Sequence, residues 1–398
     1  MAPIRMAPTA GRPFAQPKSP VFGWASLRGM ATPEAPGIQQ LPHQQLTTSG
    51  RAAILLALRQ MDLPADSAVL LPSYHCPTMV APVLAAGLQP RYYGLDEQGL
   101  PILAAVPTRE VRAILVPQLF GIARSLAAVR AWCDRHGVAL IEDCAHCLFG
   151  QAGDRPVGAW GDWATASLTK FLPVPEAGLM ASAKQAPRPW QPQQRRWIEE
   201  VKAAVDTLEL ATRYRRLRGF NTLLGGLFAL KNWRHGTASA RTMTAPSAPS
   251  AASLMIGCDM ARVHLAPLRT AAALAALPQG RLLQRRQAIH RRYAEGLRGL
   301  AGARPLFADM GTPLAPYVFP LWVDKPESVY RQLHALNAPV FRWDQIWPGT
   351  PVDLPGDNGP LWSRHVLQLL CHQDLDDAEV DRMIDVVRQL IQTPRETP

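Results

Sequence analysis

The stretch from residue 140 to residue 178 constrains the fold of this chain more than any other part. The strand that leads into it, Val138–Ile141, is a short apolar run typical of strands buried on both faces in parallel sheets. Two acids, Glu142 and Asp143, follow directly, at the place where open α/β sheets bind their ligands. A second apolar stretch leads to Lys170, whose neighbours are uncharged. A lysine in such surroundings loses its proton more easily and can attack a carbonyl carbon.

A carboxylate at one strand end and a lysine near another form the pair that pyridoxal phosphate requires. The lysine binds the cofactor aldehyde as a Schiff base, and the carboxylate keeps the pyridine nitrogen protonated. The ring then withdraws electrons from a substrate carbanion. Two charged residues alone are weak evidence for a cofactor, and the segments around them carry more information.

These segments are arranged as in one family of aminotransferases. Residues 141–146, Ile-Glu-Asp-Cys-Ala-His, resemble the I-E-D-x-A-[HQ] stretch of the DegT/DnrJ/EryC1/StrS aminotransferases. Three further motifs follow in the order of that family: Gly161-Asp162, Thr169-Lys170 and Glu176-Ala177-Gly178. The resemblance covers about residues 46–184 and 255–395. A dehydratase branch of the family has histidine in place of the lysine, so Lys170 favours amino transfer.

The resemblance implies a fold-type-I transferase that uses pyridoxal 5'-phosphate. Lys170 would bind the cofactor and move a proton between the substrate carbon and the cofactor carbon. Asp143 would hold the ring nitrogen, and His146 the phenolic oxygen. The phosphate is expected at Gly50, Arg51 and Ser167.

The sequence around Gly50 supports a phosphate site independently of the resemblance. Residues 47–49, Thr-Thr-Ser, precede an apolar helical pattern from Ala52 to Leu58, and Ser or Thr in that place reads as a helix N-cap. Glycine at that point lets backbone N–H groups approach an anion, which the helix dipole favours. A plain capped surface helix is the alternative interpretation of the same residues.

The family also stacks an aromatic side chain on the cofactor ring, because a flat π-system gains from such a contact. The usual position falls on or near Cys76 in this chain. We therefore expect the neighbouring Tyr74 or His75 to take this place.

Strands and helices alternate along the first two thirds of the chain. Expected strands are Ala68–Leu71, Gln89–Tyr93 and Val111–Pro117, and expected helices are Thr78–Ala86 and Leu126–His136. This order predicts a large α/β domain, residues 46–300, with a doubly wound, mostly parallel sheet. One long helix is expected over Leu265–Leu300. Residues 1–45 lack periodicity and are predicted to form an extended or disordered arm.

The end of the chain predicts a small C-terminal α+β domain, residues 301–398. Its expected strands are Tyr317–Val323 and Val366–Leu370, and its expected helices are Glu327–Leu336 and Asp376–Ile391.

Charge is concentrated in an insert at about residues 185–250, where the resemblance to the family is lost. The net charge is +11, and the segment 184–241 holds twelve Lys and Arg against four acids. Its spacing predicts a helix over Arg195–Arg218. A basic patch favours anionic partners, and no nucleic-acid-binding motif accompanies this one. We expect the phosphates of the acceptor, or a phosphorylated lipid carrier, to bind beside the cofactor site at Arg213, Arg215, Arg216 and Arg218.

Two other interpretations of the insert stay open. A basic amphipathic helix can lie on a membrane surface, which would make this a peripheral membrane contact. It can also be a solvated helix face.

Composition and targeting signals favour a cytoplasmic protein. No stretch reaches the roughly 18 apolar residues of a membrane-spanning helix, and the first 40 residues lack the apolar core of a signal peptide. Six scattered cysteines indicate reduced thiols. Cys144 and Cys147 form a C-x-x-C pair without a second ligand pair, so we expect no metal and read them as small buried hydrophobic residues.

The predicted function is therefore transfer of an amino group from a donor such as glutamate to a keto group. The resemblance suggests an anionic acceptor, a nucleotide-linked or otherwise phosphorylated sugar of polysaccharide or secondary-metabolite biosynthesis, and a homodimer. The alternative is a non-catalytic relative that uses the fold for binding or membrane docking. Three features favour this alternative: Asp259, where the family has an asparagine that reaches the partner's cofactor phosphate, the unusual Cys76, and the basic insert. The survival of Asp143, His146 and Lys170 together opposes it.

Overall fold

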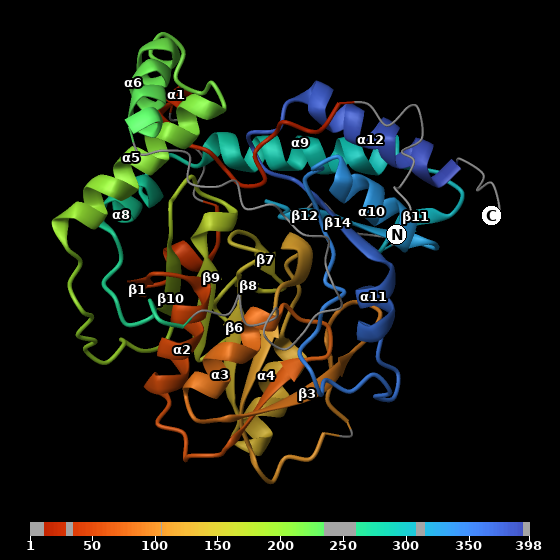
Figure 1. Cartoon of the computed structure of the whole chain (residues 1–398). Coiled ribbons are helices and arrows are strands. Elements are labelled where there is room, and N and C mark those ends of the chain that lie inside the picture. Colours follow the sequence, from red (N-terminus) through yellow and green to blue (C-terminus); the bar gives the residue numbers. More distant parts are fainter. Residues whose placement is uncertain (1–11, 29–34, 105, 235–259, 308–314, 393–398) are drawn as a thin grey trace.

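A computed structural model describes residues 12–28, 35–104, 106–234, 260–307 and 315–392. Figure 1 shows three parts: the large sheet with its helices in the lower half, the small domain at the upper right, and a helical hairpin at the upper left. In the described residues, no helix has both the length and the apolar character needed to cross a membrane.

The large sheet has eight strands in the order β1-β10-β9-β6-β5-β2-β3-β4. Their bounds are β1 (His43–Thr47), β2 (Ala68–Pro72), β3 (Gln89–Leu95), β4 (Pro101–Ile102), β5 (Val111–Pro117), β6 (Ala139–Asp143), β9 (Trp163–Ser167) and β10 (Gly178–Ser182). Five neighbouring strands, β9, β6, β5, β2 and β3, run parallel, and β4, β10 and β1 are antiparallel to their neighbours. The predicted mostly parallel sheet is therefore confirmed.

Helices cover both faces of this sheet, as its apolar strands require. Neighbouring residues of a strand point to opposite faces: Leu71 packs with α2 (Gly50–Gln60) and α3 (Val80–Ala85), whereas Leu70 joins the core cluster that includes α4 (Ala127–His136). Short elements complete the loops: α1 (Trp24–Leu27), η1 (Ile38–Gln40), η2 (Pro77–Met79), η3 (Leu119–Gly121), η4 (Leu168–Lys170) and the hairpin of β7 (Gln151–Ala152) and β8 (Arg155–Pro156).

The C-terminal part forms a second, antiparallel sheet in the order β11-β12-β14-β13, as the α+β prediction requires. Its elements are β11 (Ala303–Pro305), β12 (Val318–Val323), α10 (Pro326–Ala335), β13 (Val340–Phe341), α11 (Gly359–His365), β14 (Val366–Leu370) and α12 (Asp377–Gln392).

The prediction of one long helix over Leu265–Leu300 is wrong. The chain forms two helices there, α8 (Arg269–Ala275) and α9 (Gly280–Gly296), with Pro278 between them. Proline lacks an N–H group and clashes with the preceding turn, so a helix cannot continue through it without a break.

The predicted arm, residues 1–45, is described over residues 12–28 and 35–45, where it is packed. Phe14 is buried, and its N–H donates to the carbonyl oxygen of Leu336 at 2.7 Å. Strand β1 begins at His43, inside the predicted arm, and pairs with β10. Phe14, a large aromatic residue in an otherwise mostly polar segment, was the signal in the sequence for this packing.

The basic insert is described as far as residue 234, and it includes the helical hairpin at the upper left of Figure 1, made of α5 (Trp197–Arg213) and α6 (Asn221–Arg234). The predicted helix over Arg195–Arg218 ends early, because Arg215 takes a left-handed conformation with φ of 54°. The turn at Arg215 separates α5 from α6 and reverses the direction of the chain.

Candidate active site

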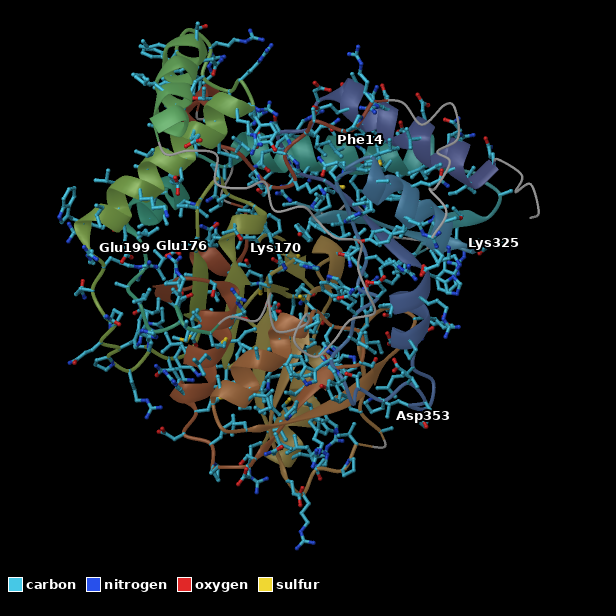
Figure 2. The ribbon with its side chains drawn as sticks, in the orientation of Figure 1. Phe14, Lys170, Glu176, Glu199, Lys325 and Asp353 are labelled. Carbon is cyan, nitrogen blue, oxygen red and sulfur yellow. The ribbon has the colours of Figure 1, made fainter. Side chains whose placement is uncertain are left out.

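A cavity of about 450 Å³ opens at the carboxyl ends of β6 and β9, beside the N-terminus of α2. It is lined by residues 48–51, Ile54, Cys76, Thr78, Met79, Asp143, Ala145, Ser167, Thr169, Lys170, residues 175–177, Arg262 and Val263. Figure 2 shows Lys170 near the middle of the molecule, above the large sheet. Five predicted site residues therefore meet in one cavity: Gly50, Arg51, Asp143, Ser167 and Lys170.

Lys170 ends the short helix η4, which follows directly on β9. Burial lowers the pKa of its ammonium group, and the nearby Cys76 and Asp143 act in the opposite direction. Its Nζ lies 5.2 Å from the centre of the Tyr317 ring, which forms part of its apolar surroundings. The lysine is therefore placed to become a neutral, nucleophilic amine.

Asp143 is the last residue of β6, and two donors fix its side chain. Its Oδ1 accepts from the N–H of Ala145 at 3.0 Å and from the hydroxyl of Thr165 at 3.4 Å. Burial raises the pKa of Asp143, whereas Lys170 and these donors lower it. The charge of Lys170 thus helps to keep this buried carboxylate ionised.

The adjacent Glu142 points to the other side of the strand and has a different role. Its Oε1 accepts from the Gln118 amide at 2.9 Å, and its Oε2 accepts from the N–H of Trp160 at 3.0 Å. Burial raises the pKa of this carboxyl group. Glu142 therefore ties two loops together, and of the two acids only Asp143 lines the cavity.

The opposite end of the cavity is built to receive an anion. The Ser49 hydroxyl caps α2 by accepting from the N–H of Ala52 at 3.2 Å, and the helix start directs backbone N–H groups and positive dipole toward the cavity. The hydroxyls of Ser167 and Thr169 lie 3.2 Å apart at the same end. A side chain at Gly50 would press on Ser167, since an added Cβ would lie 3.2 Å from the Ser167 Cβ.

Gly178, the last residue of the Glu-Ala-Gly motif, holds this end together. An added Cβ would lie 2.1 Å from the carbonyl oxygen of Ser49, far inside van der Waals contact. The motif thus requires glycine because β10 passes directly beneath the cap of α2.

Tyr74 and His75 do not take the place beside the cavity that the sequence suggested. Tyr74 is fully buried, and its hydroxyl accepts from the Gln368 amide at 3.0 Å. The His75 ring lies between the Pro72 carbonyl and the N–H of Trp347. The side chain at the cavity is Cys76, whose Sγ accepts from the Thr78 hydroxyl at 3.0 Å. The family pattern had pointed to this position, but a thiol is not an aromatic ring.

His146 lies behind the cavity and does not line it. Its ring packs on Tyr317 and Trp343, with ring centres 4.5 and 4.9 Å apart. Burial, and then the charge of Lys170, hold the pKa of His146 well below its usual range. Its neutral ring therefore packs against Tyr317, the aromatic residue next to Lys170. A direct contact of His146 with a cofactor oxygen stays a prediction.

The sequence did not single out Arg262, which lines the mouth of the cavity. Its guanidinium donates to Glu176 Oε2 at 2.7 Å, and Arg195 pairs with the other oxygen of the same carboxylate. The side chain of Arg262 is 57% exposed. Glu176 thus holds a cation at the mouth that remains open to solvent.

The four arginines expected to bind acceptor phosphates lie elsewhere. None of them lines the cavity. Arg213, Arg215 and Arg218 are exposed on the α5–α6 hairpin, and Arg216 donates to the Asp374 carbonyl at 2.7 Å. The hairpin projects from the body of the molecule (Figure 1). The expectation that these four arginines lie beside the cofactor site is therefore corrected, and the arginines that line the cavity are Arg51 and Arg262.

Cys144 and Cys147 are buried with free thiols, each within reach of a backbone carbonyl oxygen. Within the ranges that the structure describes, no group of three His, Cys, Asp or Glu side chains is arranged to hold a metal ion.

Comparison with known proteins adds to this geometry. Residues 41–186 match the model of the DegT/DnrJ/EryC1/StrS aminotransferase family. GDP-perosamine synthase of Vibrio cholerae is 25% identical over 170 residues, 40% of this chain and 46% of that protein. The L-glutamine:2-deoxy-scyllo-inosose aminotransferase of Streptomyces kanamyceticus is 28% identical over 150 residues, 36% of this chain and 35% of that protein. The matches span less than half the length of these curated relatives.

Solved structures match over most of the chain. DesI with its TDP-sugar product has a TM-score of 0.60 at 20% identity, covering 89% of this chain and 82% of that one. NtdA of Bacillus subtilis, with bound PMP, has a TM-score of 0.54 at 16% identity, covering 88% of this chain and 73% of that one. The predicted α/β architecture of this type is confirmed.

Proposed function

We propose that this chain belongs to the DegT/DnrJ/EryC1/StrS aminotransferase family, whose model matches residues 41–186, and that it is a pyridoxal-phosphate-dependent sugar aminotransferase. One observation carries the proposal. The buried Lys170, the buried Asp143 and the helix N-terminus at Gly50 all line one cavity. These are the groups that an aldehyde, a pyridine nitrogen and a phosphate need.

The residues present fit the cofactor. Gly50 keeps the space at the start of α2 clear, where a Cβ would press on Ser167, and the phosphate would bind there with Arg51. Asp143 would hold the ring nitrogen, and Lys170 would hold the aldehyde. When bound, the cofactor withdraws electrons from the substrate carbon that carries the amino group.

The chain itself would supply proton transfer and orientation. Burial lowers the pKa of Lys170, which makes its amine a better base for accepting a proton from the substrate carbon and returning it on the cofactor side. The Thr165 hydroxyl and the Ala145 N–H keep the Asp143 carboxylate aimed in one direction. The buried ring of Tyr317 would keep water away from the amine.

The substrates are part of the proposal. The donor is an amino acid such as glutamate, and the acceptor is an anionic keto sugar. The charge of Arg51 and Arg262 at the mouth of the cavity supports an anionic acceptor. Relatives named for GDP-linked and TDP-linked sugars support a nucleotide-linked one, in polysaccharide or secondary-metabolite biosynthesis.

Partners and location are proposals as well. We propose a homodimer, and contact with a membrane surface through the basic insert, whose surface is described in the next subsection. The free thiols of the described cysteines support a reducing, cytoplasmic location. Asp259, one of the features that favour a non-catalytic relative, lies outside the described residues, whereas Asp143 and Lys170, which oppose it, both line the cavity.

Absorbance spectroscopy tests the proposal. Purified protein with added pyridoxal phosphate should show a band near the edge of the visible range, and glutamate should convert it to the shorter wavelength of the aminated cofactor. The Lys170→Ala variant is the control and should show neither the band nor its conversion. A wild-type chain without the band, or one whose band no amino donor alters, would exclude an aminotransferase.

A further inference from the structure

Apolar side chains gather on the outside of the α5–α6 hairpin. Nine of the thirteen large apolar side chains that are exposed in the described residues belong to it or to its connecting turn. They are Trp197, Ile198, Val201, Leu208, Leu210, Phe220, Leu223, Leu227 and Leu230. Scattered exposed leucines need no explanation, but a concentration of this kind marks an interaction surface.

The apolar residues on and just before α6 form one continuous stripe. Phe220, Leu223, Leu227 and Leu230 follow each other at intervals of three, four and three residues, which places them on one side of a helix. They are 52%, 62%, 55% and 46% exposed. We call these four residues the α6 stripe.

Three of the four stripe residues lie outside the contacts that hold the helix in place. Phe220 meets the Trp24 ring edge-on, with ring centres 5.8 Å apart. Leu224, which falls between members of the stripe, packs against a small cluster that contains Val21, Ala211 and Leu217. The hairpin therefore has its own core, and Leu223, Leu227 and Leu230 form an apolar face beyond what its folding needs.

The border of the α6 stripe is basic. Arg213, Arg215 and Arg218 are exposed in the turn that leads into α6, and the sequence has no Asp or Glu from residue 210 to residue 253. Residues 221–230 carry no charge, and Lys231 and Arg234 follow in sequence. Both ends of α6 thus carry positive charge without acids in between.

This charge pattern selects an anionic partner. A second copy of the hairpin would bring basic ends together in either orientation of the two helices, and like charges at close range repel each other. An anionic lipid surface would instead pair the arginines with headgroups while the apolar side chains enter the acyl boundary. Helix α6 has 14 residues, about 21 Å, which suits a position in the plane of the membrane and not across it.

We propose that the α6 stripe, together with Arg213, Arg215 and Arg218, docks the protein on an anionic lipid surface. This inference concerns a surface outside the cavity and deepens the membrane contact suggested above. Docking would hold the enzyme at the membrane through the hairpin, which projects from the body of the molecule (Figure 1). The cavity is lined by residues outside the hairpin.

Vesicle co-sedimentation of the full chain, loaded with pyridoxal phosphate, tests this proposal. Wild-type protein should sediment with vesicles of phosphatidylglycerol and phosphatidylcholine, and binding to pure phosphatidylcholine should be weaker by at least about tenfold. High salt should weaken the binding to anionic vesicles, because it screens the arginines.

Two variants separate the apolar and the charged contributions. Leu223→Asn with Leu227→Asn should reduce binding to anionic vesicles by about tenfold or more, because the α6 stripe loses its centre. Arg213→Gln with Arg215→Gln and Arg218→Gln should reduce it similarly and weaken its salt dependence. A matched control, Leu84→Asn with Leu361→Asn, changes two exposed leucines on α3 and α11 and should bind as wild type does.

Three outcomes would overturn the proposal. The first is a wild-type chain that does not sediment with anionic vesicles, and the second is full binding by both hairpin variants. The third is a loss of dimer mass by light scattering in the Leu223→Asn, Leu227→Asn variant without lipid, which would assign the α6 stripe to a second copy of the chain. Amino transfer in solution should be unchanged in both variants, so a failure of this proposal is distinct from a failure of the proposed activity.

Discussion

Substitution of Gly178 by alanine tests how the strand, the helix cap and the anion end of the cavity depend on one another. The new Cβ would lie 2.1 Å from the carbonyl oxygen of Ser49 and 2.6 Å from the Thr47 Oγ1. A carbon and an oxygen that are not bonded normally stay more than about 3 Å apart, so the backbone must shift by about 1 Å. Both neighbours are fixed, because Thr47 pairs with Gly178 across β1 and β10 and Ser49 caps α2.

The expected cost follows from this geometry. Overpacking of a well-packed interior costs roughly 1–3 kcal/mol of unfolding free energy, and a clash between two backbones falls at the upper end of that range. The shift would also move the start of α2, so we expect the dissociation constant of pyridoxal phosphate to rise by about tenfold or more.

Urea unfolding without the cofactor and fluorescence titration with it measure the two effects. Gly226→Ala is the control, because an added Cβ there meets nothing within 4 Å on α6, and alanine favours the helix by up to about 1 kcal/mol. An unfolding free energy for Gly178→Ala within about 0.5 kcal/mol of wild type, with unchanged cofactor affinity, would refute the proposed link between β10 and the anion end.

Four further predictions concern the two acids, the mouth of the cavity and the lysine. Asp143→Asn should keep the fold, since an amide oxygen can accept the same two hydrogen bonds, but should lower the turnover number by at least about 10²-fold; activity within a few-fold of wild type would make Asp143 structural. Glu142→Gln should instead lower the unfolding free energy by about 1–3 kcal/mol, because one buried acceptor is replaced by a donor that faces another donor; unchanged stability in urea would contradict its role as a tie between loops. Arg262→Gln should raise the acceptor KM by about tenfold and leave the glutamate half-reaction intact, with the exposed Arg218→Gln as control; equal effects on both half-reactions would rule out an acceptor contact. Burial lowers the pKa of Lys170 in the folded, cofactor-free protein. Between this lowered pKa and the usual lysine value of about 10.4, the folded state therefore binds fewer protons at this site than the unfolded state does. The unfolding free energy should rise with pH through that window, and this rise should be absent in Lys170→Met.

The sheet could be predicted from the sequence because its strands are short apolar runs with turn residues between them, and Leu70 and Leu71 must be buried on opposite faces. Lys170 and Asp143 could be placed together because the carboxyl ends of parallel strands meet at one edge. These inferences need only local patterns and one rule about sheets.

The rest depended on contacts between distant parts of the chain. Arg262 reaches Glu176 across 86 positions, and no local pattern marks an exposed arginine as part of a cavity. Tyr74 was expected at the cofactor, but Gln368 and three aromatic neighbours draw its ring into the core. Pro278 indicates a helix break, but the apolar periodicity on both sides of it favoured one continuous helix, which the structure does not form.

The bond between one lysine and the cofactor is the central claim, and reductive labelling tests it most directly. Protein incubated with pyridoxal phosphate near neutral pH and reduced with borohydride should carry one added pyridoxyl group, and peptide mass spectrometry should locate it on Lys170, whose pKa burial lowers below that of an ordinary lysine. Label spread over exposed lysines such as Lys184, or label that persists at the same level in Lys170→Ala, would contradict the account.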